Sequence, residues 1–476
     1  MLGLFGTLNL GARSLQVQQT GVEIAGQNLA NINNPAYARQ RLDIQTSLTI
    51  PTPIGPEGTG VQAAGIQQVR DSLLDGQIQN EASVGGYWNA QQSAIENAQT
   101  QLNEFFNESS SSVDSTATAG SAATAQGLSS QLDGLFTAFQ SVATDPASLT
   151  QRQALVNQAQ TLASTFNDTA QRLGDLHTSL NTTLTSDVAS ANQLMSDVAG
   201  LNKQISVAEM TTGGTANDLR DLRQQKLEAL GNLVNFDATT ASDGSVNISI
   251  GGTQLVSGQQ VLDTLQTYDA GNGQLLVQTA TSAAPLTLTG GAIQGTIAAR
   301  DGALQTLQTS LDSLASTLVS QVNNTYKGGY DLNGKTGATF FTGTNAATIG
   351  VNSTLQNDPS SVQAAGIAGA PGDNTVALAL AQLGLQSNAA LGNQTFSDAY
   401  ALDVSSFGNS LSNANNQVAN YNALNTMLLN QRDSVSGVSL EEEMTSLITF
   451  QKAYQASAKI ITTVDQMLTT LIGLKT

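Results

Sequence analysis

The feature of this sequence that most constrains its fold is an apolar repeat in residues 437–476. Apolar side chains recur there every seven residues, and no proline interrupts them. The row consists of Leu440, Leu447, Tyr454, Ile461 and Leu468. Just before it, Ser439 and Glu442 stand three residues apart and form a capping box, which predicts that a helix begins there. A seven-residue apolar repeat is typical of a helix that packs on another helix, so this segment needs a helical partner.

A matching row stands at the other end of the chain. Leu8, Leu15, Val22 and Leu29 follow the same spacing, although Gly11 and Gln18 dilute the apolar face beside them. We predict that the two rows form an assembly seam, in which the ends pair with each other and then with other copies of the chain. The alternative is a pair of ordinary amphipathic helices packed on a globular core.

Between these ends the sequence predicts long helices and one β segment. Apolar residues follow helical spacing over 84–106, 149–210, 293–326 and 404–428. Residues 236–290 instead show short apolar runs separated by turn signals such as Asp243-Gly244, which predicts antiparallel hairpins. The expected fold is therefore mainly α with a smaller β insertion. We expect a long antiparallel helical bundle built from both chain ends, with a projecting antiparallel β domain.

The same patterns predict where the chain divides, and a length of 476 residues is enough for several domains. The predicted divisions are residues 1–45 and 434–476 for a terminal coiled-coil core domain, 46–235 and 292–433 for a long helical bundle domain, and 236–291 for a β insertion domain. Residues 109–126, which are rich in Ser, Thr and Ala, are expected to form a mobile loop.

Composition excludes several classes of function. The 36 acidic and 17 basic residues give a formal charge of -19, and no basic cluster stands out, which disfavours binding to nucleic acids and anionic membranes. The chain has no cysteine and a single histidine, His177, which we expect on the surface, so a cysteine-histidine zinc site is excluded. Neither a general secretory signal nor a membrane-spanning segment is recognisable.

Two motifs in the sequence could indicate a ligand-binding or catalytic site. Residues 329–336, GYDLNGKT, match the phosphate-binding pattern G-x-x-x-x-G-K-[ST], and the runner-up function is accordingly a P-loop nucleotide hydrolase. That loop requires a strand before it and a helix after it, whereas here a helical pattern precedes it and an extended one follows. The acidic run 441–443 is best explained by carboxylates that complement a helix dipole. We therefore predict no enzyme activity, cofactor or metal.

The terminal motifs resemble those of bacterial flagellar axial proteins, and in particular the family of flagellar hook-associated protein 1, the first junction protein between hook and filament. The shared N-terminal motif is represented by Asn28, Asn31, Pro35, Tyr37, Arg39 and Gln40. Residues 437–444 and 450–459 are similar to the ending of that family. Residues 218–258 and 291–341 favour this family over the second junction protein or flagellin. Ala36 departs from the shared motif, which usually has glycine before the tyrosine.

The resemblance implies a structural adaptor that assembles as a ring and joins hook to filament. It further implies as partners the hook protein, the second junction protein and an export chaperone, and an extracellular location reached by flagellar type III export without a cleaved signal peptide. Because few apolar residues stabilise each terminal segment, we also predict that residues 1 to about 35 and 440–476 are largely disordered in the free monomer.

Overall fold

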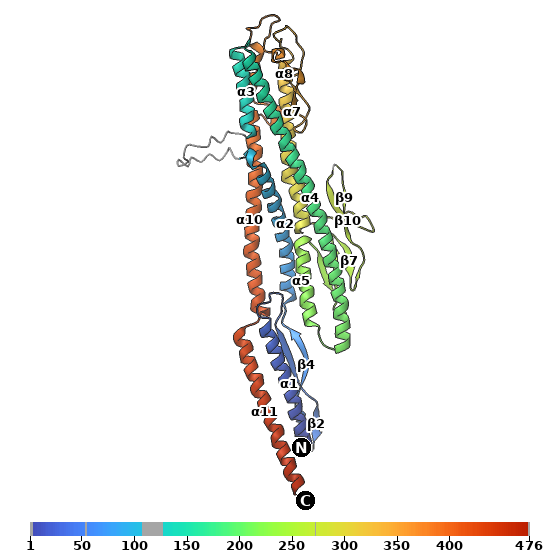
Figure 1. The fold of residues 1–476 in the computed structure, drawn as a ribbon. Helices are drawn as coiled ribbons and strands as arrows, with labels where there is room; N and C mark the ends of the chain where they lie inside the picture. The colour runs from blue at the N-terminus through green and yellow to red at the C-terminus, as the bar shows by residue number, and fades with distance from the viewer. Residues whose placement is uncertain (1–2, 53–54, 107–126, 272, 475–476) are drawn as a thin grey trace, which may run out of the picture.

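The computed structural model describes residues 3–52, 55–106, 127–271 and 273–474. Figure 1 shows a long, narrow molecule whose main helices run close to its long axis, with both chain ends at the same tip. The loop expected at residues 109–126 lies outside the described residues.

Helices make up most of the described chain. They are α1 Leu4–Ala30, α2 Ser72–Phe106, α3 Leu128–Thr144, α4 Leu149–Thr212, α5 Asn217–Leu233, α6 Gly291–Ala299, α7 Gln305–Tyr326, α8 Ser353–Asn357, α9 Thr375–Leu383, α10 Phe396–Ser436 and α11 Leu440–Gly473. The strands are β1 Gln40–Thr46, β2 Thr49–Thr52, β3 Gly55–Gly58, β4 Val61–Gln68, β5 Asp237–Thr240, β6 Val246–Ile250, β7 Thr253–Ser257, β8 Gln260–Val261, β9 Leu265–Asp269, β10 Leu275–Thr279, β11 Phe341–Thr342 and β12 Gly350–Val351.

The helix α4 sets the length of the body. Its 64 residues extend over roughly 95 Å at the usual rise of an α-helix. The Ser148 side chain accepts a hydrogen bond from the Gln151 amide at its start, and Gly213 ends it in the left-handed conformation, with φ 68°. Both boundaries lie within two residues of the predicted segment.

The β insertion lies against the lower half of α4 (Figure 1). Four strands form an antiparallel sheet in the order β5-β6-β7-β8, and β9 pairs with β10 in a separate hairpin. Asparagines on α4 hold both sheets: Asn202 donates to the carbonyls of Val246 and Gly258 at 2.8 and 2.7 Å, and Asn192 both donates to and accepts from the Leu265 backbone at 2.8 Å. The insertion is therefore fixed along the body.

The core of the body consists mainly of two large clusters of buried apolar side chains, one at its far end and one near its middle. The far cluster includes Leu132, Phe139, Phe166, Leu314 and Phe340, from α3, α4, α7 and the loops around β11. The middle cluster joins α4, α5 and α6 to the inward faces of the strands in the β insertion. Residues 327–392 form short elements and loops, and apolar side chains among them, such as Phe340 and Leu355, belong to the far cluster.

Near the middle of the body, α2 passes very close to α5 and α6. A Cβ atom on Gly86 would lie 1.9 Å from the Asn232 carbonyl oxygen, and one on Gly295 would lie 2.2 Å from the Tyr87 carbonyl oxygen. Such distances are below any real contact, so glycine is required where these backbones meet.

The helical segment predicted at 293–326 contains a π turn, Arg300–Leu304, between α6 and α7. The buried Arg300 guanidinium donates to Asn181 on α4 at 2.6 Å and to the Asp301 carboxylate at 2.7 and 2.8 Å. His177, expected on the surface, is half-buried near this point. Burial and the Arg300 charge lower the pKa of His177.

Candidate functional site

The terminal helices and the body meet at a joint, which we define as the three connecting segments 31–39, 69–71 and 437–439. We call α1, α11 and β1–β4 the terminal unit, and α2 to α10 with the β insertion the body (Figure 1). Strand β1 pairs with β4 along their whole length and carries the terminal unit to residue 68. We therefore propose a domain boundary at residues 69–71, beyond the one expected at residues 45 and 46.

Within the terminal unit, α1 and α11 lie antiparallel in a definite register. The hydroxyl groups of Ser14 and Ser457 are hydrogen-bonded at 2.8 Å. Seven residues along α1, the Phe450 ring lies against Gly21, where a Cβ atom would be 2.6 Å from the ring. After seven more residues, the Asn28 amide donates to the Glu443 carboxylate at 3.0 Å. One seven-residue row of each helix therefore faces the other.

The predicted seam lies beside these facing rows. Leu8, Leu15, Val22 and Leu29 are half-buried, as are Leu447, Ile461 and Leu468. Leu440 and Tyr454 are 53% and 41% exposed. The side chain of Ile461 lies against Gly11, which explains why a glycine stands in that part of α1. The other face of α1 packs through Val17 and Ile24 on the β1–β4 pair.

The predicted motif residues converge on Asn28, which is buried at the top of α1. Its amide nitrogen donates to the Gln40 carbonyl at 2.9 Å as well as to Glu443, and its oxygen accepts from the Gln40 amide at 3.0 Å and from the Tyr37 hydroxyl at 2.8 Å. Burial and nearby carboxylates, chiefly Asp218, raise the pKa of Tyr37 well above its usual range, so the phenol remains a donor.

Arg39 connects the motif to the first turn of α11. Its guanidinium pairs with Glu443 at 2.7 Å and with Glu442 at 2.6 Å. Glu443 is only 4% exposed, so part of the acidic run forms a buried contact in addition to complementing the helix dipole. Helix α11 begins where the capping box predicts, because the Ser439 hydroxyl accepts from the Glu442 amide, but the Glu442 carboxylate pairs with Arg39 and does not complete the box.

The remaining motif residues have separate roles. Gln40 donates to Asp218 on α5 at 3.0 Å, and Asn31 donates to the Gln27 carbonyl at the end of α1. The Pro35 carbonyl accepts from Arg432 on α10. Ala36 has a negative φ, so alanine causes no backbone strain in place of the glycine usual in this motif.

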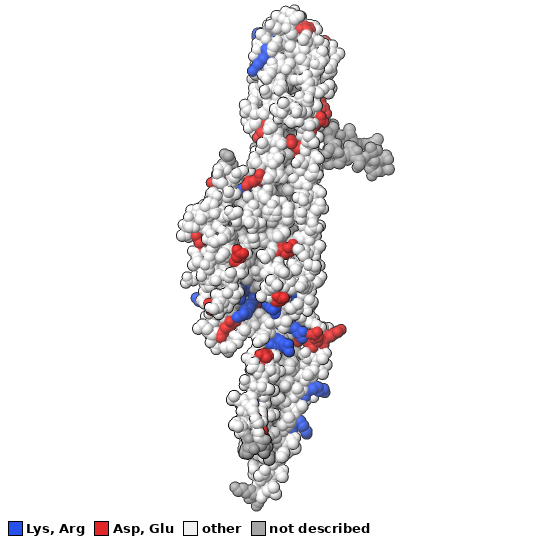
Figure 2. Space-filling view, turned by 180° about the vertical axis from the view of Figure 1, so that it is seen from behind, with Lys and Arg blue, Asp and Glu red and all other residues white. Residues whose placement is uncertain are grey.

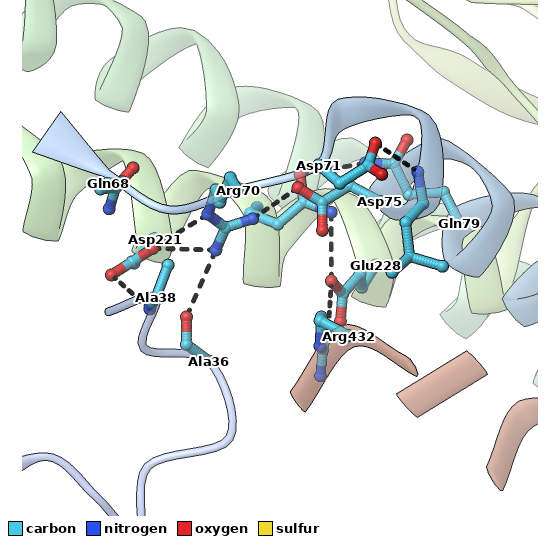
Figure 3. Close-up of polar contacts among 12 residues, drawn as sticks. Ala36, Ala38, Gln68, Arg70, Asp71, Asp75, Gln79, Asp221, Glu228 and Arg432 are labelled. Carbon is cyan, nitrogen blue, oxygen red and sulfur yellow. Dashed lines mark hydrogen bonds and ion pairs between the residues drawn. The ribbon is translucent and has the colours of Figure 1, made fainter. Parts of the chain in front are cut away.

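Arg70, which sequence reasoning did not single out, lies at the centre of the joint (Figure 3). Its guanidinium pairs with Asp75 on α2 and with Asp221 on α5, each at 2.8 Å, and donates to the Ala36 carbonyl at 3.4 Å. The same Asp221 accepts from the Ala38 amide at 3.2 Å. Burial raises the pKa of Asp75 and of Asp221, and Arg70 opposes both shifts.

Charged side chains gather at this level of the molecule. Figure 2 shows basic and acidic groups around the joint, while most of the surface above it is uncharged. An open groove of about 530 Å³ lies beside the joint and is lined by residues from the 31–39 loop and from the 433–442 segment. No pattern in the sequence connects Arg70 with Asp221, which lies 151 residues away, so this cluster could not be found without the fold.

The phosphate-loop lookalike has the wrong setting for nucleotide binding. Helix α7 precedes it, and Tyr330 forms an antiparallel bridge with Thr336 where a helix would have to begin. The Asp331 carboxylate accepts the amides of Asn333 and Lys335 at 2.8 Å, so these donors are used within the turn. The runner-up prediction of a P-loop hydrolase therefore has no structural support.

In the part of the chain that the structure describes, no group of three or more histidine or acidic side chains could hold a metal ion. No helix among those residues is both long and apolar enough to cross a membrane.

Comparisons with known proteins point to the same kind of protein as the sequence motifs at the two chain ends and in residues 218–258 and 291–341. A family model described as the flagellar hook-associated protein FlgK helical domain matches residues 120–341, and one described as the flagellar basal body rod FlgEFG protein C-terminal matches residues 430–474. Flagellar hook-associated protein 1 of Bacillus subtilis (strain 168) is 26% identical over 520 residues, which covers 99% of each chain. The protein of the same name from Escherichia coli (strain K12) is 24% identical over 568 residues, covering 98% of this chain and 99% of that protein.

Two other matches concern a short segment and the fold. The flagellar hook protein FlgE of Caulobacter vibrioides is 60% identical over 40 residues, which is 8% of this chain. The solved structure of the flagellar hook junction protein FlgK from Burkholderia pseudomallei matches with a TM-score of 0.61 and 19% identity, covering 76% of this chain and 100% of that one. This likeness confirms the predicted fold class. Taken together, the matches show that the chain is similar to flagellar hook-associated protein 1 over nearly its whole length.

Proposed function

We propose that this chain is a structural adaptor at the junction between the flagellar hook and filament, and that copies of it assemble as a ring through α1 and α11. Its similarity to hook-associated proteins over nearly the whole chain supports a place in the flagellum. The curated relatives and the solved structure are named for the hook and its junction. The ring and its seam are our proposal.

The observation that carries this proposal is the apolar surface that α11 leaves uncovered. Only three of its 34 residues are buried, namely Glu443, Ser457 and Val464. Large apolar side chains are exposed along the helix at Leu440, Met444, Ile448, Tyr454, Ile460, Met467 and Leu471. Large apolar side chains that remain exposed along a helix are typical of a protein interaction site. We propose that neighbouring copies cover it.

The same similarity supports the proposed partners. The match of residues 430–474 to rod proteins and the short match to a hook protein support contact with the hook. We further propose contact with the second junction protein, delivery by an export chaperone, and type III export to the outside of the cell.

The test places charge on the exposed part of the seam. In the double variant Leu440→Asp and Tyr454→Asp, two carboxylates would have to be buried between copies, which is strongly unfavourable. We expect this variant to be absent from isolated hook-basal bodies of cells that make it as their only version of the chain, and we expect motility to be lost. Immunoblotting of the purified particles measures incorporation.

The matched control adds the same charges to the body, by Ser186→Asp and Ser190→Asp on the exposed face of α4. This variant should be incorporated normally. Circular dichroism must show that both variants are folded. Incorporation of the seam variant at the wild-type level would refute assembly through this surface.

A further inference from the structure

The terminal unit has apolar surfaces on two different sides, and this matters for how copies can meet. A ring of more than two copies is built from heterologous contacts, in which one surface of each copy meets a different surface of the next. The two surfaces must therefore lie on opposite sides of the copy and at similar heights.

The first surface is the predicted seam, which points away from the strands. On α1, Leu15 and Val22 belong to the seam, and each stands two residues before a residue that packs on the β1–β4 pair, namely Val17 and Ile24. Two residues turn an α-helix by about 200°. The seam row and the strand-facing row therefore lie on opposite sides of α1.

Helix α11 extends this surface. Tyr454 stands three residues before Ser457, which faces α1, while Leu15 stands one residue after Ser14, which faces α11. Both offsets turn the helix in the same sense, by about 60° and about 100°. In an antiparallel pair, rows offset in the same sense lie on the same side. We define this seam side as Leu8, Leu15, Val22 and Leu29 of α1 with Leu447 and Tyr454 of α11.

The second surface lies at the start of the β2–β3 hairpin, beyond α1. Leu48 is 82% exposed and Ile50 is 48% exposed. Arg13 of α1 donates to the Ser47 hydroxyl at 2.7 Å, and the adjacent Ser14 is hydrogen-bonded to the middle of α11. Figure 1 shows β2 and α11 on different sides of α1. We define this hairpin side as Arg13, Leu48 and Ile50, and it lies at the height of the middle of α11.

The two sides also carry opposite charges. Arg13 is exposed on the hairpin side, and among the described residues it donates to the uncharged Ser47. Asp465 is exposed and stands eleven residues after Tyr454, which is about three helical turns, so it lies on the seam side. Neither charge has an ion-pair partner in the part of the chain that the structure describes. The two residues differ by about 10 Å in height, which extended arginine and aspartate side chains can span.

We propose that, in the assembled ring, the hairpin side of each copy covers the seam side of the next, and that Arg13 of one copy pairs with Asp465 of its neighbour. This inference rests on the ring assembly proposed above and names the surface that faces the seam. It requires no order in the terminal helices of the free monomer, because the contact forms only between assembled copies.

The test reverses each charge and then exchanges the pair. Arg13→Asp and Asp465→Arg each place like charges at every contact of the ring, so incorporation into hook-basal bodies should fall about tenfold or more. The double variant Arg13→Asp with Asp465→Arg again has opposite charges at every contact. Its incorporation should return close to the level of the unsubstituted chain, as measured by immunoblotting of the isolated particles.

The matched control is Lys459→Asp, which changes the charge by the same amount as Arg13→Asp. Lys459 is exposed and stands two residues after Ser457, so it points away from α1 and belongs to neither side. This variant should be incorporated normally. Circular dichroism should show the same helical body in all variants, because each substitution lies in the terminal unit.

A second measurement does not depend on charge. The chain has no cysteine, so Leu48→Cys with Tyr454→Cys places one thiol on each side. In isolated hook-basal bodies, a long bismaleimide crosslinker should join the copies into a ladder of dimers and larger species. Either substitution alone should give no species larger than the monomer, because the contact is heterologous.

Failure of the double charge variant to recover, or the absence of a ladder from incorporated chains, would overturn the pairing of the hairpin side with the seam side. If the variant Leu440→Asp with Tyr454→Asp is excluded from the same particles, assembly through α11 stands and only the facing surface is wrong. If that variant is incorporated normally, the ring assembly itself is wrong.

Discussion

Asn28 is a polar residue in the row of α1 that faces α11, and its amide is used completely. An asparagine side chain has two N–H donors and two acceptor lone pairs, and all four are engaged by Gln40, Glu443 and Tyr37. A buried amide that is fully paired fixes register, because sliding either helix would leave costly unpaired groups. At the scale of one residue, this explains how a weakly apolar helix pair keeps a single alignment.

Glu209 provides a pH-dependent contribution to the stability of the body. It accepts two hydrogen bonds from the Arg220 guanidinium at 2.7 and 2.9 Å, and this contact lowers the pKa of Glu209 below its ordinary value of 4.5 although burial opposes the shift. Because the folded pKa is the lower one, the stabilisation is complete above pH 4.5 and is lost as the pH falls through the folded pKa.

We therefore expect Glu209→Gln to lower the urea midpoint of unfolding at neutral pH, with a difference from the unsubstituted chain that shrinks as the pH is lowered below 4.5. Arg220→Gln should show the same pH dependence, because it removes the same pair. A difference that stays constant over the whole pH range would show that this carboxylate does not contribute through its charge.

At the scale of single elements, helices here are positioned by close backbone approaches as well as by apolar faces. The glycine contacts of α2 with α5 and α6 allow three helix backbones to meet where side chains would keep them apart. The asparagines on α4 act similarly for the β insertion, since each binds backbone groups of the strands directly. These contacts explain why the insertion lies along the body.

Two glycine substitutions test this packing. A methyl group on Gly86 would collide with the Asn232 carbonyl, so Gly86→Ala should destabilise the body by about 2 kcal/mol or more. Gly174 lies inside α4 with no atom near its missing Cβ, so Gly174→Ala should stabilise the protein by roughly 0.5 to 1 kcal/mol through helix propensity. Thermal and urea unfolding measure both. Equal effects of the two substitutions would contradict the close approach at Gly86.

At the scale of the whole molecule, burial is distributed unevenly. Ten of the 22 residues of α7 are buried, compared with three of the 34 residues of α11. The body therefore has a dense core, whereas the terminal unit is a thin structure with much of its apolar surface open. Stability usually follows such differences in local burial.

This contrast leads to a prediction for the free monomer. Residues 1 to about 35 and 440–476 are expected to be largely disordered in dilute solution and to be held as helices once other copies cover them, because ordering costs more than their own contacts return. Hydrogen exchange should be fast for amides of α1 and α11 and slow for those of α4 and α7. Strong protection of both terminal helices in the dilute monomer would rule this out.

The sequence alone predicted the long helices, the β insertion and the resemblance to hook-associated proteins. Apolar spacing located the long helices, Asp243-Gly244 located the turn between β5 and β6, and Ser439 with Glu442 located the start of α11. Each of these signals depends on residues close together in the chain. The seam remains a prediction for the same reason: spacing shows which residues share a helix face, but not what covers that face.

Only the tertiary structure decided how the parts meet. It showed that Glu443 is buried, that the rows in contact are those of Asn28 and Phe450, and that β4 returns beside β1. It also placed Arg70 between carboxylates from two helices. The physical reason is that ion pairs and close backbone contacts join residues far apart in sequence, and no local periodicity records which of them become neighbours.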